Sequence, residues 1–410
     1  MTTGTVSKTT NSPGAPDPTF AQGGYLTLDA EGYAISVIDI GNGNGVCLWK
    51  PDKGFGLVCF DSAGNLVIGF GNAGYVFGNF SDDVYHSSSP EEVIIRFDDL
   101  IVVFGTVYVS STRQFFPAAA CYDQRGQLFQ SFGQGGKTVV WDFHDNNALS
   151  NRPQASPASS TEGQILENVI FAFYPFTDGG SYLICLNNVG ERQYLFNGNG
   201  VLPLMHGQVP LRLTALARQP DGQIVLAAFS EGAPAVIARV KTDGTLDRSF
   251  AQNGFHTLND SSVRLDSLFI RADKTISAVA SNPVSENRYM LLLKLDTHGN
   301  SEPNFNSGKE LRVDVLGLEL YPHVLKIDRQ GHWCVAGDVF RSAQPNTRCS
   351  LLMRFLSSGL ADSGFGSGGC VVDDEPGGYQ ALHLEPDDRF LVGGFTGLFP
   401  FFTRIARYLA

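Results

Sequence analysis

The sequence predicts an all-β fold, a seven-bladed β-propeller with four-stranded blades, on the basis of three observations. A glycine–phenylalanine motif recurs along the chain, the segments between its copies have the pattern of short strands joined by turns, and the two chain ends together make up one repeat. No segment longer than a few residues has the 3.6-residue period of an amphipathic helix, so we expect helices to be nearly absent.

The motif consists of glycine, five residues, phenylalanine, three residues and glycine. It is clearest at residues 244–254, GTLDRSFAQNG, and the phenylalanines of its seven copies are Phe20, Phe70, Phe132, Phe196, Phe250, Phe305 and Phe365. In the copy around Phe305, Lys309 replaces the final glycine. Successive phenylalanines are 50 to 64 residues apart. This period is too long for ankyrin or leucine-rich repeats and suits a four-stranded propeller blade.

The residues between two motifs predict the strands of one blade. Residues 213–244, LTALARQPDGQIVLAAFSEGAPAVIARVKTDG, contain an apolar strand, a Pro-Asp-Gly turn, a second apolar strand, a loop and a third strand. The fourth strand follows the motif itself, as in residues 254–258, GFHTL.

One position of the third strand differs between early and late repeats. Five residues before the motif, the late copies have a basic residue and the early copies a cysteine: Arg239, Lys294 and Arg354, and Cys59, Cys121 and Cys185. We interpret it as a strand-face position filled by a snorkelling stem or a small apolar side chain. A three-cysteine metal site is the less favoured alternative, because equivalent positions on different blades lie far apart. The chain has 7 cysteines and no Cys-x-x-Cys pair, so we expect buried thiols in a reducing compartment.

The chain ends predict how the ring closes. Residues 403–410 form a third strand with no motif after it, whereas residues 14–28 begin with a motif and a fourth strand. We therefore expect the N-terminal strand to complete the last blade, which removes exposed sheet edges. Residues 1–13 are expected to be a flexible tail and residues 14–410 a single propeller domain.

The phrases PDGQIVLAA (220–228), IARVKTDGTLDRSFAQNGF (237–255) and GLADSGFGSGG (359–369) resemble the delta-60 repeat family of bacterial β-propeller proteins. The resemblance extends over residues 14–410, is strong at 211–260 and 379–410, and is weak between 27 and 200. It implies a propeller, but the family brings no agreed activity and no catalytic residues.

Composition and motifs argue against several function classes. The net charge of -12 disfavours nucleic acid and anionic membrane surfaces as partners. Two Gly-x-Gly-x-x-Gly strings lie inside the repeat motif with no helix after them, so they do not predict nucleotide binding. The eight histidines are scattered and no nucleophile elbow occurs, so we expect neither a metal nor a cofactor. A catalytic triad assembled from different blades stays open.

The N-terminal residues lack the apolar core of a secretory signal, and the longest uncharged apolar run, residues 100–109, is too short to span a membrane. We expect a soluble protein without a membrane span. It would be cytoplasmic or exported by a route without a cleaved signal.

The candidate binding residues lie where the chain departs from its repeat. An insertion at residues 141–164 opens with Trp141, Phe143 and His144, and loops on a rigid scaffold are frequent binding sites. The alternative is that Trp141 and Phe143 end a strand before a Ser/Pro-rich linker. Near the C-terminus, Phe399 and Phe401 exceed what the strand pattern requires and would form an apolar contact patch if exposed, whereas Phe402 is expected in the core.

We favour a non-enzymatic, monomeric scaffold that recognises another macromolecule, first of all a protein, through its loops and axial face. A carbohydrate-binding propeller is one alternative, but it should repeat a Trp or Tyr in most blades, and the chain has only 3 Trp. A hydrolase or lyase with its active site in the axial funnel is the other. It would need titratable residues at the ends of several inner strands, and these strands show no shared acid or base.

Overall fold

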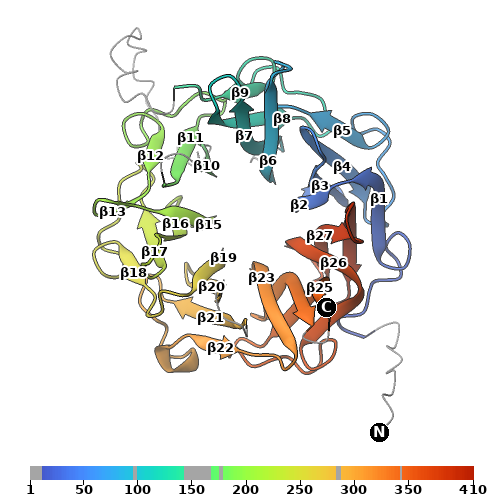
Figure 1. Cartoon of the computed structure of the whole chain (residues 1–410), viewed down its shortest axis with the longest axis vertical. Helices are drawn as coiled ribbons and strands as arrows, with labels where there is room; N and C mark the ends of the chain where they lie inside the picture. Colours follow the sequence, from blue (N-terminus) through green and yellow to red (C-terminus); the bar gives the residue numbers. More distant parts are fainter. Residues whose placement is uncertain (1–11, 96–98, 143–167, 175–178, 283–287, 342–343) are drawn as a thin grey trace.

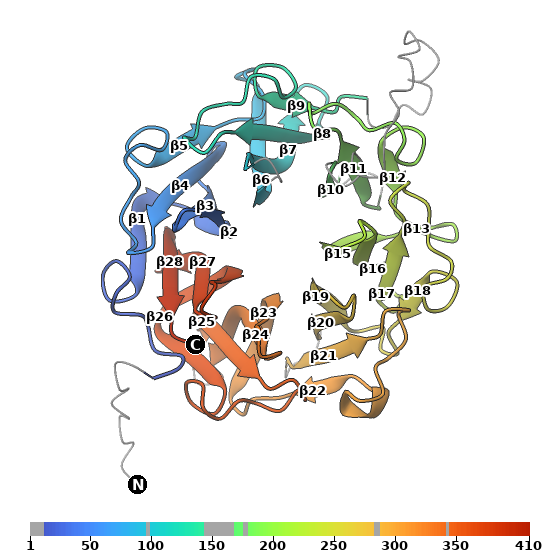
Figure 2. The same ribbon diagram turned by 180° about the vertical axis from the view of Figure 1, so that it is seen from behind.

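The structure, a computed structural model, describes residues 12–95, 99–142, 168–174, 179–282, 288–341 and 344–410. The strands form a ring of sheets around a central axis, with β2, β6, β15, β19 and β23 nearest the axis and β1, β5, β12, β18 and β22 at the outside (Figures 1 and 2). In the described residues the only helical element is one 3₁₀ turn, η1 (Asn306–Gly308). The fold is an all-β propeller, as the sequence predicts.

Four sheets are four-stranded and antiparallel throughout. The first consists of β2 (Tyr33–Gly41), β3 (Asn44–Lys50), β4 (Phe55–Asp61) and β5 (Tyr75–Gly78). The second consists of β6 (His86–Ile95), β7 (Ile101–Val109), β8 (Gln114–Tyr122) and β9 (Lys137–Val139). Another consists of β15 (Arg212–Arg218), β16 (Ile224–Phe229), β17 (Val236–Val240) and β18 (Phe255–Thr257). The last consists of β19 (Arg264–Ile270), β20 (Ile276–Ser281), β21 (Met290–Leu295) and β22 (Leu311–Val313).

The remaining described strands form sheets of other sizes. Between β9 and β15 lie a three-stranded sheet, β10 (Val169–Phe173), β11 (Tyr182–Leu186) and β12 (Val201–Pro203), and a hairpin, β13 (Met205–His206) and β14 (Val209–Pro210). The C-terminal part forms one seven-stranded sheet in the order β1-β28-β27-β26-β25-β24-β23. Its strands are β1 (Tyr25–Glu31), β23 (Leu318–Ile327), β24 (Trp333–Arg341), β25 (Gln344–Phe355), β26 (Cys370–Leu384), β27 (Phe390–Thr396) and β28 (Phe402–Tyr408).

The prediction of seven four-stranded blades is wrong. Counting sheets of at least four strands, the described residues form five blades: the four regular sheets and the seven-stranded sheet. The strand β26 explains the merger, because its 15 residues pair first with β25 and then with β27, so that two repeats share one strand. Between β9 and β15 the described strands are short, and their largest sheet has three strands.

The expected pairing of the two chain ends is confirmed. β1 is antiparallel to β28, with Tyr25 opposite Ala406 and Thr27 opposite Arg404. Figure 2 shows β1 at the outer edge beside β28. The first motif loop adds a backbone bond from Gly14 N to Leu409 O at 2.8 Å. The N-terminal strand therefore covers the edge that β28 would otherwise expose.

The core lies between neighbouring sheets, and the motif phenylalanines are part of it. All seven are at most 2% exposed. The first motif glycine is needed for two reasons, as Gly244 shows: its φ is +83°, and a Cβ there would lie 2.7 Å from the backbone nitrogen of Asn197 in the preceding copy. Only glycine allows two successive motif loops to approach so closely.

Backbone hydrogen bonds join successive motif loops around the ring. In six copies the residue after the phenylalanine donates to the carbonyl before the next copy's first glycine, at 2.6 to 3.0 Å: Ala21 to Ala63, Gly71 to Arg125, Gly133 to Val189, Asn197 to Asp243, Ala251 to His298 and Gly366 to Pro13. The last bond again joins the two ends of the chain. The copy with Lys309 forms the turn η1 instead.

Two of the three basic residues at this position of the third strand, Arg239 and Arg354, form buried ion pairs rather than snorkelling into solvent. Arg239 contacts Asp247 at 2.8 Å and Arg354 contacts Asp362 at 2.7 Å, and both guanidinium groups lie 4.8 Å from the centre of the motif phenylalanine ring. Arg407 repeats this arrangement at the chain ends.

The equivalent cysteines are Cys59, Cys121 and Cys185, and they are fully buried, consistent with a role as small apolar fillers. No group of three or more His, Cys, Asp or Glu in the described part of the chain is placed to hold a metal ion. None of the described elements is a helix long and apolar enough to cross a membrane.

Candidate functional site

Six of the innermost strands carry a β-bulge at the corresponding place. The register shifts by one residue between Ala34 and Ser36 in β2, and the same shift occurs in β6, β15, β19, β23 and β26. The bulged residues are Ile35, Glu91, Thr214, Asp266, His323 and Gln380. A bulge turns a side chain away from the alternation of its strand, and bulges are frequent beside binding and active sites.

Five of these bulged residues line one cavity of about 590 Å³ on the axis of the ring, between β2, β6, β10, β15, β23 and β26. Its charged and titratable lining residues are Glu91, Glu92, His323, Lys326 and His383. The sixth bulged residue, Asp266, is close enough to His323 for their charges to interact. Polar side chains from several inner strands therefore converge near the axis of the ring.

A buried carboxylate fixes the position of His323. Asp338 on β24 is 0% exposed and accepts a hydrogen bond from His323 Nε2. Its other oxygen lies 2.9 Å from Arg348 Nε. The imidazole is held through one nitrogen while about a third of its side chain remains accessible. This is the arrangement of an oriented hydrogen-bonding group or proton acceptor.

Carboxyl groups on the axis hold their protons more tightly than usual. Burial raises the pKa of Glu91 to about 7, against the opposing charge of Lys50, and the neighbouring Glu92 raises it further. The pKa of Glu92 is also raised by burial, which the charge of Lys326 opposes. Glu91 and Glu92 expose surface, but this surface faces the axial cavity, where protein surrounds them and hydration is weaker than in bulk water.

The pKa of Asp266 on β19 is raised for a similar reason. Burial raises its pKa to about 7, although a hydrogen bond from Ser281 and the charge of His323 act in the opposite direction. Its Oδ2 is buried without a hydrogen-bond partner among the described residues. Burial likewise lowers the pKa of His383, helped by the charge of Lys326. The axial cavity and its surroundings therefore contain two carboxyl groups, Glu91 and Asp266, that change protonation near neutral pH.

Three of the binding residues predicted from the sequence, Trp141, Phe399 and Phe401, are described, and they lie outside the axial cavity. Trp141 is 50% exposed and packs against Phe116 at 5.0 Å and His86 at 5.5 Å between ring centres. Phe143 and His144 lie outside the described residues. None of the described candidate residues lines the axial cavity.

The aromatic residues near the C-terminus are exposed to different degrees. Phe399 is 88% exposed, whereas Phe401 is 36% exposed and packs on Phe395 with 4.7 Å between ring centres. Phe402, which was expected in the core, is also 36% exposed, and its neighbour Thr403 is the buried residue instead. The prediction that Phe402 lies in the core is therefore wrong: side chains alternate along the strand, and it is the next residue, Thr403, that points inward.

Sequence reasoning missed the axial residues because they share a position but not a residue type. An alignment of the inner strands places Glu91, Thr214, Asp266, His323 and Gln380 at one level. A search for one repeated acid or base passes over such a set. A polar residue between apolar neighbours was the available signal at Thr214, His323 and Gln380, whereas Glu91 and Asp266 are each followed by another polar residue.

No protein-family model matches this sequence, and no curated protein matches it. Solved structures match its fold. A chain from a structural study of two prolyl endopeptidases is 10% identical, with a TM-score of 0.50, and the match covers 92% of this chain and 50% of that chain. A streptogramin B lyase is 10% identical with a TM-score of 0.45, covering 94% of this chain and 98% of its own. The Dos1 propeller is 10% identical with a TM-score of 0.46, covering 93% and 94%. At these identities the likeness shows the propeller fold alone.

Proposed function

We propose that this protein is a binding propeller whose axial cavity holds a polar ligand at the ring of bulged residues. The observation that carries this proposal is the convergence of Glu91, Thr214, His323 and Gln380 from four different strands on one cavity. A volume of about 590 Å³ lies within the range of small-molecule sites, roughly 300–1,000 Å³. A purely structural core would instead fill this position with apolar side chains.

The distribution of charge indicates which chemical groups the ligand carries. Glu91 and Glu92 are adjacent on β6 and offer carboxyl oxygens to hydrogen-bond donors, and a positively charged ligand group would favour their ionised form. Lys326 and His383 favour an acceptor such as a carboxylate or carbonyl oxygen. We therefore expect a ligand with an amine and an acceptor group, either free or as part of a larger molecule. A protein partner, the first expectation from the sequence, would present such a group at the mouth of the cavity. Membership of the delta-60 repeat family is part of the same proposal and is supported by the repeated motif.

A second candidate function is general acid–base catalysis on the bound ligand. One observation favours it: His323, positioned by the buried Asp338, shares the cavity with Glu91, which carries a proton up to about pH 7. An oriented base and a protonated acid in one cavity are the minimum that a hydrolase or lyase requires. Loss of product formation in His323→Ala, with ligand binding retained, would favour this function over simple binding.

The binding proposal is tested with a panel of amino acids, dipeptides, polyamines and amino sugars. A compound that binds the folded protein raises its melting temperature, by an amount equivalent to about 2.7 kcal/mol at 100 times its Kd. We expect at least one compound to stabilise the wild type and to lose this effect in Glu91→Leu and His323→Ala. The matched control is Phe399→Ser, which removes an exposed ring outside the cavity and should respond like the wild type. Equal stabilisation of all four proteins would contradict the axial site.

A further inference from the structure

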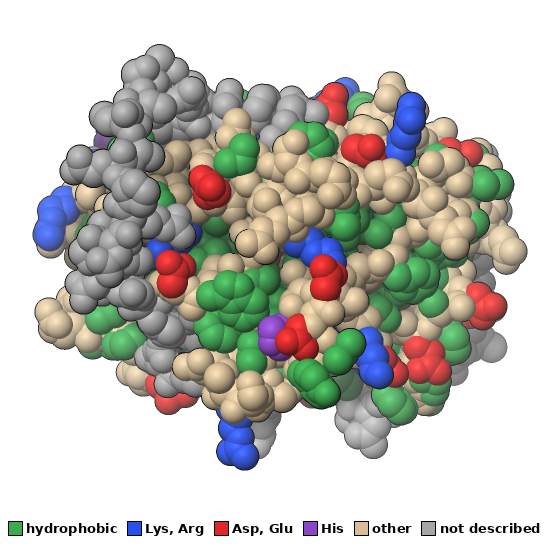
Figure 3. Space-filling model, turned by 90° about the horizontal axis from the view of Figure 1, so that it is seen from above, with side chains coloured by type: hydrophobic (Ala, Val, Ile, Leu, Met, Phe, Trp, Pro, Cys, Tyr) green, Lys and Arg blue, Asp and Glu red, His purple; other side chains and the backbone are tan. Residues whose placement is uncertain are grey.

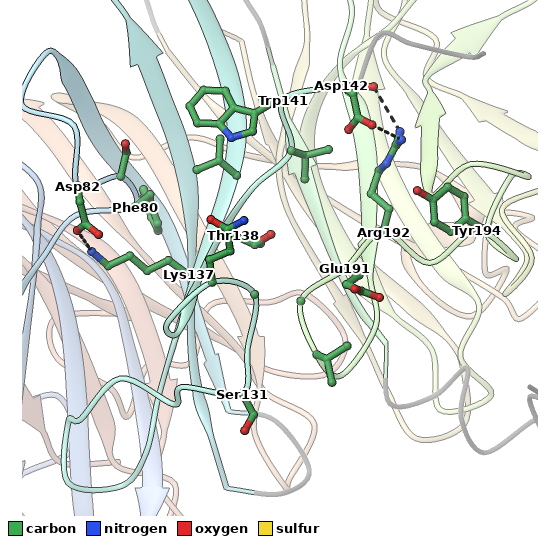
Figure 4. A pocket seen from close by; sticks show the side chains of 17 residues that line it. Phe80, Asp82, Ser131, Lys137, Thr138, Trp141, Asp142, Glu191, Arg192 and Tyr194 are labelled. Atoms are coloured by element: carbon green, nitrogen blue, oxygen red, sulfur yellow. Dashed lines mark hydrogen bonds and ion pairs between the residues drawn. The ribbon is translucent and has the colours of Figure 1, made fainter. Parts of the chain in front are cut away.

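A second cavity, of about 640 Å³, lies apart from the axial one and shares no lining residue with it. It is bordered by residues of β9, by the segment that follows β9, and by the motif loop at residues 189–194. Figure 4 shows two ion pairs on its opposite sides, Asp82 with Lys137 at 2.5 Å and Asp142 with Arg192 at 2.8 Å. The indole ring of Trp141 lies between these pairs at the upper border in that view.

Trp141 is a fixed but accessible aromatic surface. The edge-on contact with Phe116 and the tilted contact with His86 restrict the ring, yet half of the residue remains exposed. The other two tryptophans, Trp49 and Trp333, are at most 2% exposed. A rigid, exposed indole loses little conformational entropy when a ligand covers it, which is why such rings are frequent binding anchors.

The polar groups of this cavity are held in place and nearly balanced in charge. Among the described lining residues, each basic side chain is paired with an acidic one, and Glu191 is the one further charge. The side chain of Arg192 is 5% exposed and its guanidinium lies 5.4 Å from the centre of the Tyr194 ring. The face of the molecule seen in Figure 3 also has acidic and basic side chains scattered among other residues, without a field of one sign. Such a surface favours a neutral polar ligand over an ionic one.

We propose that this lateral cavity binds a carbohydrate, with Trp141 as the stacking surface. A pyranose ring combines an apolar face of C–H groups, which packs on an indole, with a rim of hydroxyls that both donate and accept hydrogen bonds. The cavity offers the matching set: acidic oxygens of Asp82, Asp142 and Glu191 as acceptors, and Lys137 and Arg192 as donors. Its size fits an oligosaccharide segment within the usual range of ligand sites. The proposal is independent of the axial site.

The test uses the protein's own fluorescence. Because Trp49 and Trp333 are buried, acrylamide quenching reports mainly on Trp141. The probes are cello-, malto-, xylo-, manno- and chitohexaose, together with a glycan array. We expect at least one glycan to protect the wild type from quenching by about twofold and to bind saturably in calorimetry.

Variants separate a stacking site from an unspecific effect. Trp141→Ala should weaken calorimetric binding by about tenfold or more, and Trp141→Phe should retain part of it. Glu191→Gln should weaken binding without unfolding the protein, because it removes one exposed carboxylate, and it therefore tests the site even if Trp141→Ala folds poorly. Leu316→Ser, which removes a fully exposed side chain outside both cavities, is the control and should bind like the wild type. Binding of no glycan, or binding unchanged in Trp141→Ala and Glu191→Gln, would overturn the proposal.

Discussion

Replacing Asp17 by alanine should weaken the ring at the seam between the two chain ends. Asp17 is 2% exposed, and its Oδ2 lies 2.8 Å from Arg407 Nε and 2.8 Å from Arg389 Nη1. Arg407 is equally buried and also donates to Thr19 Oγ1 at 3.0 Å and to the carbonyl oxygen of Ser62. This pair therefore connects the first motif loop, the last strand and the loop after β4.

The expected loss of stability follows from the burial of this pair. Removing one partner of a buried ion pair leaves the other charge uncompensated, which costs about 3–5 kcal/mol. Glu385 Oε1 stays 3.7 Å from Arg407 Nη1 and offsets part of this cost, so we expect about 3 kcal/mol for Asp17→Ala. This is a large share of the roughly 5–15 kcal/mol that stabilises a typical domain.

The assay is urea unfolding with linear extrapolation, in which the midpoint should fall and the slope should stay constant. The matched control is Asp362→Ala, which breaks the same motif pair inside the chain, where the two side chains are 10% and 15% exposed. It should cost less, because this pair is less completely buried than Arg407 and Asp17, whose side chains are 2% and 3% exposed, so that water reaches the remaining guanidinium more easily. The double variant Asp17→Leu/Arg407→Met should regain most of the loss, since it removes both members of the buried pair while Arg389 keeps Glu385 and Asp387 as partners. A cost below about 1 kcal/mol for Asp17→Ala, or a larger cost for Asp362→Ala, would refute this reasoning.

Three further predictions concern the repeat and the axial carboxyl groups. Removing residues 1–12 should leave the melting temperature nearly unchanged, whereas removing residues 1–28 should lower it severely. The second deletion removes β1, which pairs with β28, together with Phe20 and Leu28, which are at most 2% exposed. Similar melting curves for the two proteins would contradict this prediction. In urea unfolding, Gly244→Ala should destabilise the protein by more than Gly232→Ala. Both glycines have positive φ, but only Gly244 lacks space for a Cβ. Equal losses of unfolding free energy would contradict the close approach of the motif loops. Glu91 should contribute a fall in the free energy of unfolding as the pH rises from about 4.5 to 7, because folded Glu91 keeps its proton to about pH 7 while an unfolded glutamate loses it near 4.5. Unfolding curves of Glu91→Gln should show a shallower fall, and an unchanged pH profile would contradict the raised pKa.

The repeat and the pairing of the two chain ends could be predicted from the sequence, because both depend on local patterns. The spacing of Gly244, Phe250 and Gly254 reports a loop that only glycine can form, and it recurs wherever one repeat meets the next. The number of blades could not be read in the same way. It depends in part on whether β26 breaks between its pairing with β25 and with β27, which is decided by hydrogen bonding along 15 residues rather than by any one of them. It also depends on the sheet of β10, β11 and β12, which has only three described strands.

Side-chain direction was the harder part of the prediction. Phe402 and Thr403 exchange sides if the register shifts by one residue, and alignment of the strands did not fix this step. The bulges that turn Glu91 and His323 toward the axis are also register shifts, so an alternating pattern places these residues incorrectly.

The buried ion pairs could have been predicted from the sequence. The copies with a basic residue in the third strand also have an acidic residue three positions after the first motif glycine: Asp17, Asp247, Glu302 and Asp362. The copies with a cysteine have Val67, Phe129 and Gln193 there. This joint change of two positions indicates that they are in contact, and the ion pairs of Arg239 and Arg354 confirm it.

The central claim is that a polar ligand binds at the axial ring of bulged residues, and retention of small molecules tests it most directly. Wild type, His323→Ala and Phe399→Ser would be equilibrated with a cell metabolite extract, washed, denatured and analysed by mass spectrometry. The account predicts at least one polar compound, bearing an amine and an acceptor group, that the wild type and Phe399→Ser retain and His323→Ala does not. Retention of the same compounds by all three proteins, or of none by the wild type, would contradict it.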